Sequence, residues 1–233
     1  MTVKIYQVGG SVRDKLMGVV SKDIDFAVEA ESFQAMKDHI LERGYKIYLE
    51  TPKFMTIRAQ HPDLGGVDFS LCRKDGEYHN GRHPDDVESG TILDDLARRD
   101  FTMNAIAIDV DSGEILDPHN GREDIDARKI RAVGSAKVRF GEDKLRALRA
   151  LRFAITKNMT IASDTLLELF ALDDVPLTDF DAVSTDRIRD ELYKMFAANT
   201  KRTIQYVLAD FAWVLRLCES RGIWFKPTTE IIK

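Results

Sequence analysis

The chain has 233 residues, of which 44% are hydrophobic and 31% are charged, and its formal net charge is −5. This apolar content exceeds that of disordered chains and suits one large domain or two smaller ones. The negative charge excludes a protein that binds nucleic acid through its overall charge, so any RNA contact must use a local basic face.

The first half of the chain predicts a mixture of strands and helices. Strands are expected at residues 3–8, 24–28, 45–49, 54–59 and 67–71, and helices at residues 11–17 and 32–43. Gly44 follows the second helix and is a good helix stop. Residues 73–90 are rich in Gly, Asp, His, Asn and Pro, which predicts a long loop of the kind that is usually functional or disordered.

The second half predicts helices, with signals that begin near Asp94. A strand pair is expected first, at residues 104–110 and 114–116, around the turn 111–113. From Gly141 onward we expect helices at 142–157, 163–172, 184–198 and 201–220 and no further strand. The chain therefore predicts a head domain at residues 1–135 and a helical neck with a shortened body at residues 136–233.

Three other classes of protein are disfavoured. No run approaches the roughly 20 apolar residues of a membrane helix, and the N-terminus lacks the pattern of a signal peptide. Cys72 and Cys218 are far apart, which argues against a disulfide framework and against a cysteine metal site. We therefore expect a cytoplasmic protein with no membrane partner.

Two aspartates, Asp23 and Asp25, stand at the start of the second predicted strand. Successive side chains of a strand point to opposite faces, so these two carboxylates share a face. They repel each other unless a cation lies between them, and hard ions such as Mg²⁺ take carboxylate and phosphate oxygens. Asp68, a polar residue in an apolar strand, is a candidate third carboxylate. Asp-x-Asp alone is a common sequence, so the alternative to a metal site is a strand end whose aspartates are simply solvated.

Gly9-Gly10 ends the first predicted strand just before a helix. This arrangement brings free backbone N–H groups and a helix N-terminus together, which suits a phosphate. Ser11 is expected to cap the helix or to donate to a phosphate oxygen, and Arg13 is expected to reach a phosphate. The alternative is a tight turn that needs glycine for backbone reasons.

Two later motifs make the pattern specific. They are the segment 95–107, Asp-Leu-Ala-Arg-Arg-Asp-Phe-Thr-Met-Asn-Ala-Ile-Ala, and the segment 142–146, Glu-Asp-Lys-Leu-Arg. With the first motif and in this order, they closely resemble class II tRNA nucleotidyltransferases (CCA-adding enzymes) and bacterial poly(A) polymerases, within the polymerase-β-like nucleotidyltransferase superfamily. The resemblance implies an α+β fold: a nucleotidyltransferase head of mixed sheet and helices, followed by an all-helical neck.

The resemblance also implies an activity. Members add C and/or A from CTP and ATP to the 3′ end of tRNA or another RNA and release pyrophosphate by a two-metal mechanism. It implies that Asp23 and Asp25 bind catalytic Mg²⁺, with Asp68 as a third catalytic candidate. It assigns the ribose and triphosphate to Arg99, Asp100 and Asn104. The last two are four residues apart, so on a helix they would share a face.

The segment 142–152 carries arginines at every third position, beside a parallel stripe of leucines. On one helix, Asp143 and Arg146 would be neighbours. The resemblance implies that these two side chains read the base, while Arg149 and Arg152 face the triphosphate or the primer. The alternatives are a surface ion pair and packing residues with solvated heads. The full set of nucleotide-binding candidates is Gly9, Gly10, Ser11, Arg13, Arg99, Asp100, Asn104, Asp143, Arg146, Arg149 and Arg152.

Two regions bear on the substrate. Residues 73–84 resemble the family's flexible loop and include Arg82. An intact loop favours an enzyme that adds CCA over one that adds only CC. His79 and His83 in this loop could suggest a zinc site, but the sequence offers no third ligand. Typical members continue through a long helical body and tail, whereas this chain stops at Lys233. This leaves open a compact variant, a homodimer that completes the site, and a smaller RNA substrate. The aromatic residues Trp213, Trp224 and Phe225 are expected in a core or interface rather than on RNA.

Rival functions remain open at this point. A poly(A) polymerase would carry out the same chemistry with a longer product. A non-catalytic RNA- or nucleotide-binding relative would not need to keep the acidic pair. A small-molecule nucleotidyltransferase would fit if the short end cannot hold RNA.

Overall fold

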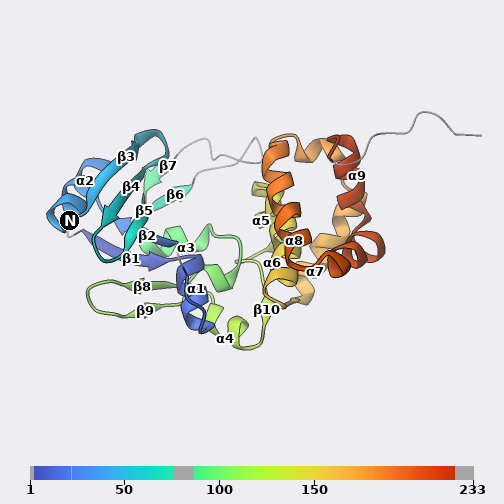
Figure 1. The fold of residues 1–233 in the computed structure, drawn as a ribbon, viewed down its shortest axis with the longest axis horizontal. Coiled ribbons are helices and arrows are strands. Elements are labelled where there is room, and N and C mark those ends of the chain that lie inside the picture. The colour runs from blue at the N-terminus through green and yellow to red at the C-terminus, as the bar shows by residue number, and fades with distance from the viewer. Residues whose placement is uncertain (1–2, 22, 76–86, 224–233) are drawn as a thin grey trace, which may run out of the picture. The chain divides into compact units, whose positions relative to one another are not determined.

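The computed structural model describes residues 3–21, 23–75 and 87–223 (Figure 1). The described residues up to Ala127, together with Ala132–Gly134, form one compact unit. Arg128–Arg131 and the described residues from Ser135 onward form a second unit.

The first unit contains a seven-stranded mixed sheet. Across the sheet, the strand order is β3 (Lys46–Thr51), β4 (Thr56–His61), β5 (Gly65–Leu71), β2 (Ile24–Glu29), β1 (Lys4–Val8), β8 (Ala107–Asp109) and β9 (Ile115–Leu116). Only β2 and β5 pair in parallel, and the other neighbours are antiparallel. Each strand predicted for this unit is present, including the pair around 111–113. Two of them begin clearly later than expected, because Phe54 and Asn104 belong to 3₁₀ turns: β4 begins at Thr56 and β8 at Ala107.

The two faces of this sheet are covered differently. Helix α2 (Phe33–Glu42) packs Met36 and Ile40 against one face, over an apolar cluster that includes Phe26 and Phe69 (Figure 1). Ser32 caps this helix by accepting a hydrogen bond from the backbone N–H of Ala35. The opposite face has a smaller apolar cluster over β1 and β8. The Asp25 carboxylate of β2 lies on that face.

Helix α3 (Ile92–Ala97) packs in that smaller cluster through Ile92 and Leu96. Thr91 begins the helix with a capping box, in which its hydroxyl accepts from the backbone N–H of Asp94 and the Asp94 carboxylate accepts from Thr91. The helical signal expected near Asp94 is therefore confirmed, although the helix begins two residues earlier.

The expected loop at 73–90 is wrong at its two ends. Strand β6 (Arg73–Asp75) pairs with β7 (Val87–Ser89) in an antiparallel ribbon. The polar composition of these residues hid the pairing, because the apolar alternation that marks a strand is missing from this segment. The residues between the strands, which include His79, Arg82 and His83, lie outside the described part.

Helix α4 (Gly121–Asp126) packs tightly on a 3₁₀ turn, η2 (Thr102–Asn104), within the first unit. Asp124 accepts a hydrogen bond from the Thr102 hydroxyl at 2.7 Å. A Cβ atom at Gly121 would lie 2.2 Å from the carbonyl oxygen of Thr102. Only glycine therefore fits at this contact.

We expect Gly121→Ala to lower the free energy of unfolding by about 2 kcal/mol, because the added methyl group meets backbone that cannot rotate away. Chemical denaturation measures the change. Gly141→Ala is the matched control, since nothing lies within 4 Å of a Cβ there and the residue is helical, so alanine should be neutral or stabilising. Equal stability of the Gly121 variant and the wild type would contradict the packing.

The second unit is mainly helical. Its α-helices are α5 (Ala136–Glu142), α6 (Leu145–Thr156), α7 (Ser163–Ala171), α8 (Thr185–Gln205) and α9 (Ala212–Ser220). Two 3₁₀ turns, η3 (Leu172–Asp174) and η4 (Leu177–Phe180), connect α7 with α8. Trp213 is fully buried and stacks on Phe180, which confirms its expected core position; Trp224 and Phe225 lie outside the described residues.

Three expectations for this half are wrong. Strand β11 (Thr160–Ile161) pairs in parallel with β10 (Lys129–Ile130), so the region after 141 does contain a strand. The expected helix 142–157 is two helices separated at Asp143 and Lys144. The expected helix 201–220 is interrupted by a π-helical segment, Tyr206–Asp210, and by Phe211.

Two chemical expectations can be compared with the described residues. Cys72 and Cys218 are free thiols and both are buried, so no disulfide joins them. Within the part of the chain that the structure describes, no helix has both the length and the apolar character to cross a membrane.

Candidate active site

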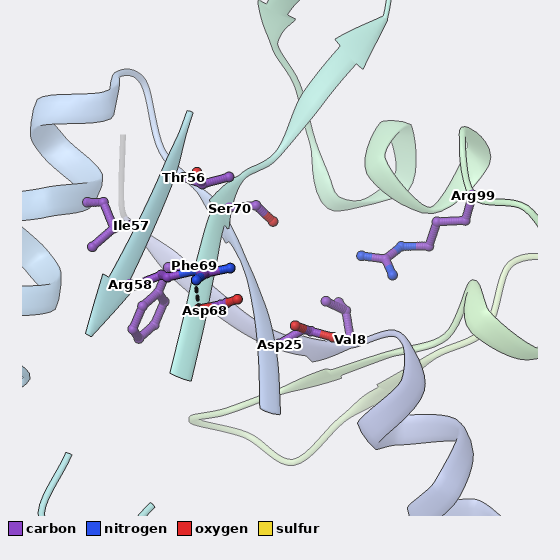
Figure 2. Close-up of a pocket in the computed structure, with 9 residues that line it drawn as sticks. All are labelled: Val8, Asp25, Thr56, Ile57, Arg58, Asp68, Phe69, Ser70 and Arg99. Atoms are coloured by element: carbon purple, nitrogen blue, oxygen red, sulfur yellow. Dashed lines mark ion pairs between the residues drawn. The ribbon is translucent and has the colours of Figure 1, made fainter. Parts of the chain in front are cut away.

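The carboxylates of Asp25 and Asp68 lie side by side because their strands are in register. β2 and β5 run in parallel, and these two residues are direct partners in the ladder. Both line a cavity of about 300 Å³ on the sheet face opposite α2, together with Arg58 and Arg99 (Figure 2). Asp23, just before β2, lines an adjoining cavity that also includes Asp25 and Asp68. The three predicted carboxylates therefore all line this second cavity.

The pKa of Asp25 is raised above its usual value. Partial desolvation of its carboxylate by the cavity walls is the largest cause, although the residue as a whole remains exposed to solvent. The charge of Arg99 opposes the shift, and the charges of Asp68 and Asp23 add to it. This repulsion is the kind that a bound cation relieves.

The donor set fits a hard divalent cation that keeps part of its shell for substrate. Among the described residues, no group of three or more His, Cys, Asp or Glu side chains is drawn together as a complete metal site. Mg²⁺ commonly binds one or two carboxylates and completes its octahedron with water and substrate phosphates. Asp25 and Asp68 supply adjacent carboxylates of this type.

Arg99 points into the same cavity and is held by a residue that the sequence interpretation missed, Asp95. Arg99 donates to one Asp95 oxygen at 2.8 Å, and Arg98 pairs with the other. Asp95 is fully buried. Burial by itself raises its pKa, but the two guanidinium groups overcome this effect and leave the pKa below the usual value. The spacing of four residues between Asp95 and Arg99 was the available signal.

The glycine turn lies close to these charges. Gly9 has φ of +72°, a conformation that favours glycine, and α1 (Gly10–Leu16) begins directly after it. A Cβ atom at Gly9 would lie 3.1 Å from an Arg99 nitrogen and 3.6 Å from an Asp25 oxygen. The turn therefore leaves room where the guanidinium and the carboxylate approach the backbone.

Ser11 and Arg13 are placed differently from their expected roles. The Ser11 hydroxyl donates to the carbonyl of Val8 at 3.1 Å, it is buried, and it does not cap α1. Arg13 is also buried and pairs with Asp14 at 2.9 Å. Its guanidinium donates to the Asn104 side chain at 2.8 Å. Both side chains thus join the turn to its surroundings rather than lie open to a phosphate.

Asp100 and Asn104 meet as predicted, but not on an α-helix. The backbone bends at Asp100 and continues into η2. The Asn104 amide donates to Asp100 at 2.9 Å, and the same Asp100 oxygen accepts from the backbone N–H of Phe101 at 2.8 Å. Arg13, Asn104 and Asp100 therefore form a buried hydrogen-bonded chain that links the first and second motifs.

In the second unit, Asp143 and Arg146 do not pair with each other through their side chains. Asp143 is in extended backbone between α5 and α6, so the expectation that it shares a helical face with Arg146 is wrong. Its carboxylate accepts from Arg187 at 2.9 Å and from the backbone N–H of Leu145. Arg146 pairs with Glu142 and donates to the carbonyl of Arg139. Each side chain is thus held by its own partner.

Arg149 and Arg152 share the buried carboxylate of Glu191 on α8. The guanidinium of Arg152 also lies 3.9 Å from the centre of the Phe153 ring. Sequence reasoning did not include Glu191, whose partners are on a different helix. These two arginines are therefore ordered by a contact between α6 and α8.

Comparison with known proteins agrees with the sequence motifs. Residues 5–131, more than half of the chain, match the family described as the poly A polymerase head domain. The chain is 38% identical over 232 residues to a CCA-adding enzyme of Oceanobacillus iheyensis, which covers 98% of this chain and 54% of that protein. It is 35% identical over 231 residues to the multifunctional CCA protein of Laribacter hongkongensis, over 97% of this chain and 53% of that protein.

Solved structures give the same result. The Bacillus stearothermophilus CCA-adding enzyme in complex with CTP superposes with a TM-score of 0.72 at 29% identity, over 94% of this chain and 52% of that one. The chain spans about half the length of the curated relatives it matches. The expected α+β, polymerase-β-like fold is confirmed by this similarity. The chain belongs to the poly A polymerase head domain family, together with the CCA-adding enzymes that it resembles.

Proposed function

We propose that this protein is a template-independent RNA nucleotidyltransferase that adds C and/or A from CTP or ATP to the 3′ end of tRNA. The observation that carries the proposal is the register pairing of Asp25 with Asp68, which opens on a cavity that Arg99 also lines. The family membership and the CCA-adding relatives support it. The free thiols fit a reducing compartment, so we propose the cytoplasm as its location.

The proposed reaction is an in-line displacement. The oxygen of the RNA 3′-hydroxyl attacks the α-phosphorus of the nucleotide, the bond from that phosphorus to the bridging oxygen breaks, and pyrophosphate leaves. Arg99, oriented by Asp95, neutralises charge on the phosphates. Asp25 and Asp68, with Asp23, would hold Mg²⁺, which when bound polarises the phosphate and makes the hydroxyl a better nucleophile.

The buried chain of Arg13, Asn104 and Asp100 supports a positioning role. Its members already satisfy one another, so they fix the 3₁₀ turn beside the glycine turn. A fixed turn presents polar groups to the ribose without reorganisation during the reaction. We propose that Asp100 and Asn104 select the ribonucleotide and that Arg13 holds Asn104 for this purpose.

We propose that Asp143 and Arg146 read the base. The acceptor oxygens of Asp143 would take the amino group of C or A, and Arg146 would donate to ring or carbonyl acceptors. U and G present a carbonyl at that position, which would leave the carboxylate unpaired. Arg187 and Glu142, which hold the two side chains, support this role because they limit their motion.

We expect Arg146→Ala to reduce the preference for CTP over UTP by about 10- to 100-fold, because a hydrogen bond from a charged group contributes about 1.5–3 kcal/mol. The ratio of kcat/KM for the two nucleotides measures it. Arg189→Ala is the matched control, since Arg189 forms an exposed ion pair on α8 and should leave the ratio unchanged. An unchanged ratio in the Arg146 variant would remove it from base recognition.

The proposed function is tested with radiolabelled CTP or ATP, Mg²⁺, and a tRNA that lacks its 3′ end. We expect one to three nucleotides to be added, and sequencing the product ends shows their order. No incorporation with either Mg²⁺ or Mn²⁺ would refute the proposal. A long product with ATP alone would identify a poly(A) polymerase, and Mg²⁺-dependent nucleotide binding without turnover would identify a non-catalytic relative.

A further inference from the structure

Two cavities meet at the candidate carboxylates. The first, of about 300 Å³, includes Arg99; the second, of about 420 Å³, is lined by Asp23, Ile24, Asp25, Tyr48, Arg58, Gly66 and Asp68. Asp25, Arg58 and Asp68 belong to both. The proposed reaction assigns the triphosphate to the first cavity and leaves the second without a ligand.

The two cavities extend in different directions along the strands: the second includes Asp23 and Gly66, near the starts of β2 and β5, and the first includes Ser70, near the end of β5. Tyr48 is on β3 at the edge of the sheet, Arg58 is on β4, and the carboxylates follow on β5 and β2. In Figure 2, Arg58 and Arg99 lie on opposite sides of Asp25 and Asp68. An in-line displacement needs the attacking oxygen and the leaving group on opposite sides of the phosphorus. The second cavity shares the carboxylates but not Arg99, so it offers the attacking hydroxyl a place away from the proposed triphosphate site.

Arg58 gives this cavity a charge that suits an anionic strand. Three aspartates line the cavity, and Arg58 is the cation among the described residues that line it. Its Nε lies 3.3 Å from an Asp68 oxygen, with 57% of the Arg58 side chain and 49% of the Asp68 side chain exposed. Such an exposed pair holds its partners weakly. The guanidinium is thus able to turn to a phosphate while Asp68 binds a cation.

Tyr48 supplies a surface for a base. Tyr48 is 59% exposed, it belongs to the edge strand β3, and it lines the same cavity as Arg58. Exposed aromatic rings next to arginine are the usual platform for unpaired bases, because every base has a face that stacks.

We propose that Arg58 and Tyr48 form the acceptor subsite, in which Arg58 binds the backbone phosphate next to the 3′-terminal nucleoside of the RNA and Tyr48 stacks on a terminal base. This inference rests on the proposed function, because it takes RNA as the substrate that is extended. The two residues bind the acceptor strand and take no part in bond breaking.

Steady-state kinetics separates the two substrates. We expect Arg58→Ala to raise the KM for the RNA acceptor about tenfold, the usual loss for one charge-assisted hydrogen bond, with little change in the KM for CTP. Arg58→Lys should recover part of the loss, and Tyr48→Ala should also raise the acceptor KM. Arg43→Ala is the matched control, because Arg43 forms an ion pair with Asp111 and lines neither cavity. Its acceptor KM should equal that of the wild type.

Direct binding keeps this test independent of turnover. Fluorescence anisotropy with a labelled single-stranded RNA that ends in a 3′-deoxynucleotide should show weaker binding by the Arg58 and Tyr48 variants. The slope of log affinity against log salt should decrease in magnitude by about 0.7 in Arg58→Ala, as expected for one lost phosphate contact on a single strand. If the wild type adds no nucleotide but the variants still weaken RNA binding, the proposed function fails, and Arg58 and Tyr48 remain an RNA-binding site rather than an acceptor subsite.

Three results would overturn the inference. The first is an Arg58 variant with a raised KM for CTP and a normal acceptor KM, which would place the guanidinium on the triphosphate. The second is a normal acceptor KM with a lower Mg²⁺ requirement, which would make Arg58 a simple counter-charge for Asp68. The third is RNA binding by both variants that equals binding by the wild type.

Discussion

Asp25→Asn should lower the rate of nucleotide addition by about a thousandfold, while the protein keeps its fold. The substitution preserves the size of the side chain but removes the charge that would hold Mg²⁺ beside Asp68. Metal-assisted stabilisation of a phosphoryl transition state contributes several kcal/mol, and each 1.36 kcal/mol is a factor of ten in rate. Single-turnover incorporation of radiolabelled CTP measures the effect.

The design of this experiment separates chemistry from stability. The pKa of Asp25 is raised, since desolvation and the neighbouring aspartates make its charge unfavourable in the folded state. Neutral asparagine should therefore leave the melting temperature unchanged or slightly higher. Asp38→Asn, on the exposed side of α2, is the matched control and should keep full activity. Normal activity in Asp25→Asn would exclude this carboxylate from the site.

Asp95→Asn should lower the free energy of unfolding by about 3 kcal/mol at pH 7. Asp95 is fully buried between two arginines, and neutralising it leaves both guanidinium groups without their counter-charge. This loss of stability is at the lower end of the range for broken buried ion pairs, because both arginines keep some contact with solvent. Urea denaturation measures it. The KM for CTP should also rise, since Arg99 loses the partner that orients it.

The stabilisation by Asp95 should depend on pH in a definite direction. The pKa of Asp95 is lower in the folded protein than in the unfolded chain, where it is about 3.9. Its stabilising contribution is fully present above that value and disappears as the pH falls through the lower folded-state pKa. The difference between Asp95→Asn and the wild type should therefore be largest at neutral pH and shrink below about pH 4.

A control variant shows whether the stability loss in Asp95→Asn comes from the burial of Asp95 or from its four-residue spacing to an arginine. Asp190 and Lys194 are also four residues apart on a helix, but their ion pair is exposed. Asp190→Asn should therefore cost less than about 0.5 kcal/mol. Equal losses for Asp190→Asn and Asp95→Asn would show that burial of Asp95 between the arginines does not matter.

Features set by neighbouring residues were predictable from the sequence. The strand before Gly9, the helix that ends just before Gly44 and the shared face of Asp23 and Asp25 follow from periodicity and helix-stop signals. These signals work because backbone hydrogen bonding and side-chain direction repeat over a few residues. The same reasoning failed at Asp143, where two helices meet and the backbone is extended.

The partners of the candidate residues were decided by tertiary structure. The sequence marked Asp68 as a candidate, but only the parallel register of β2 and β5 puts it beside Asp25. Arg13 reaches Asn104 across 91 residues of chain, which no local pattern encodes. By itself, the sequence determined the fold class and named most of the chemical groups of the candidate site. Sheet register and side-chain packing decided which groups meet, because those contacts form only when distant segments bury their apolar faces together.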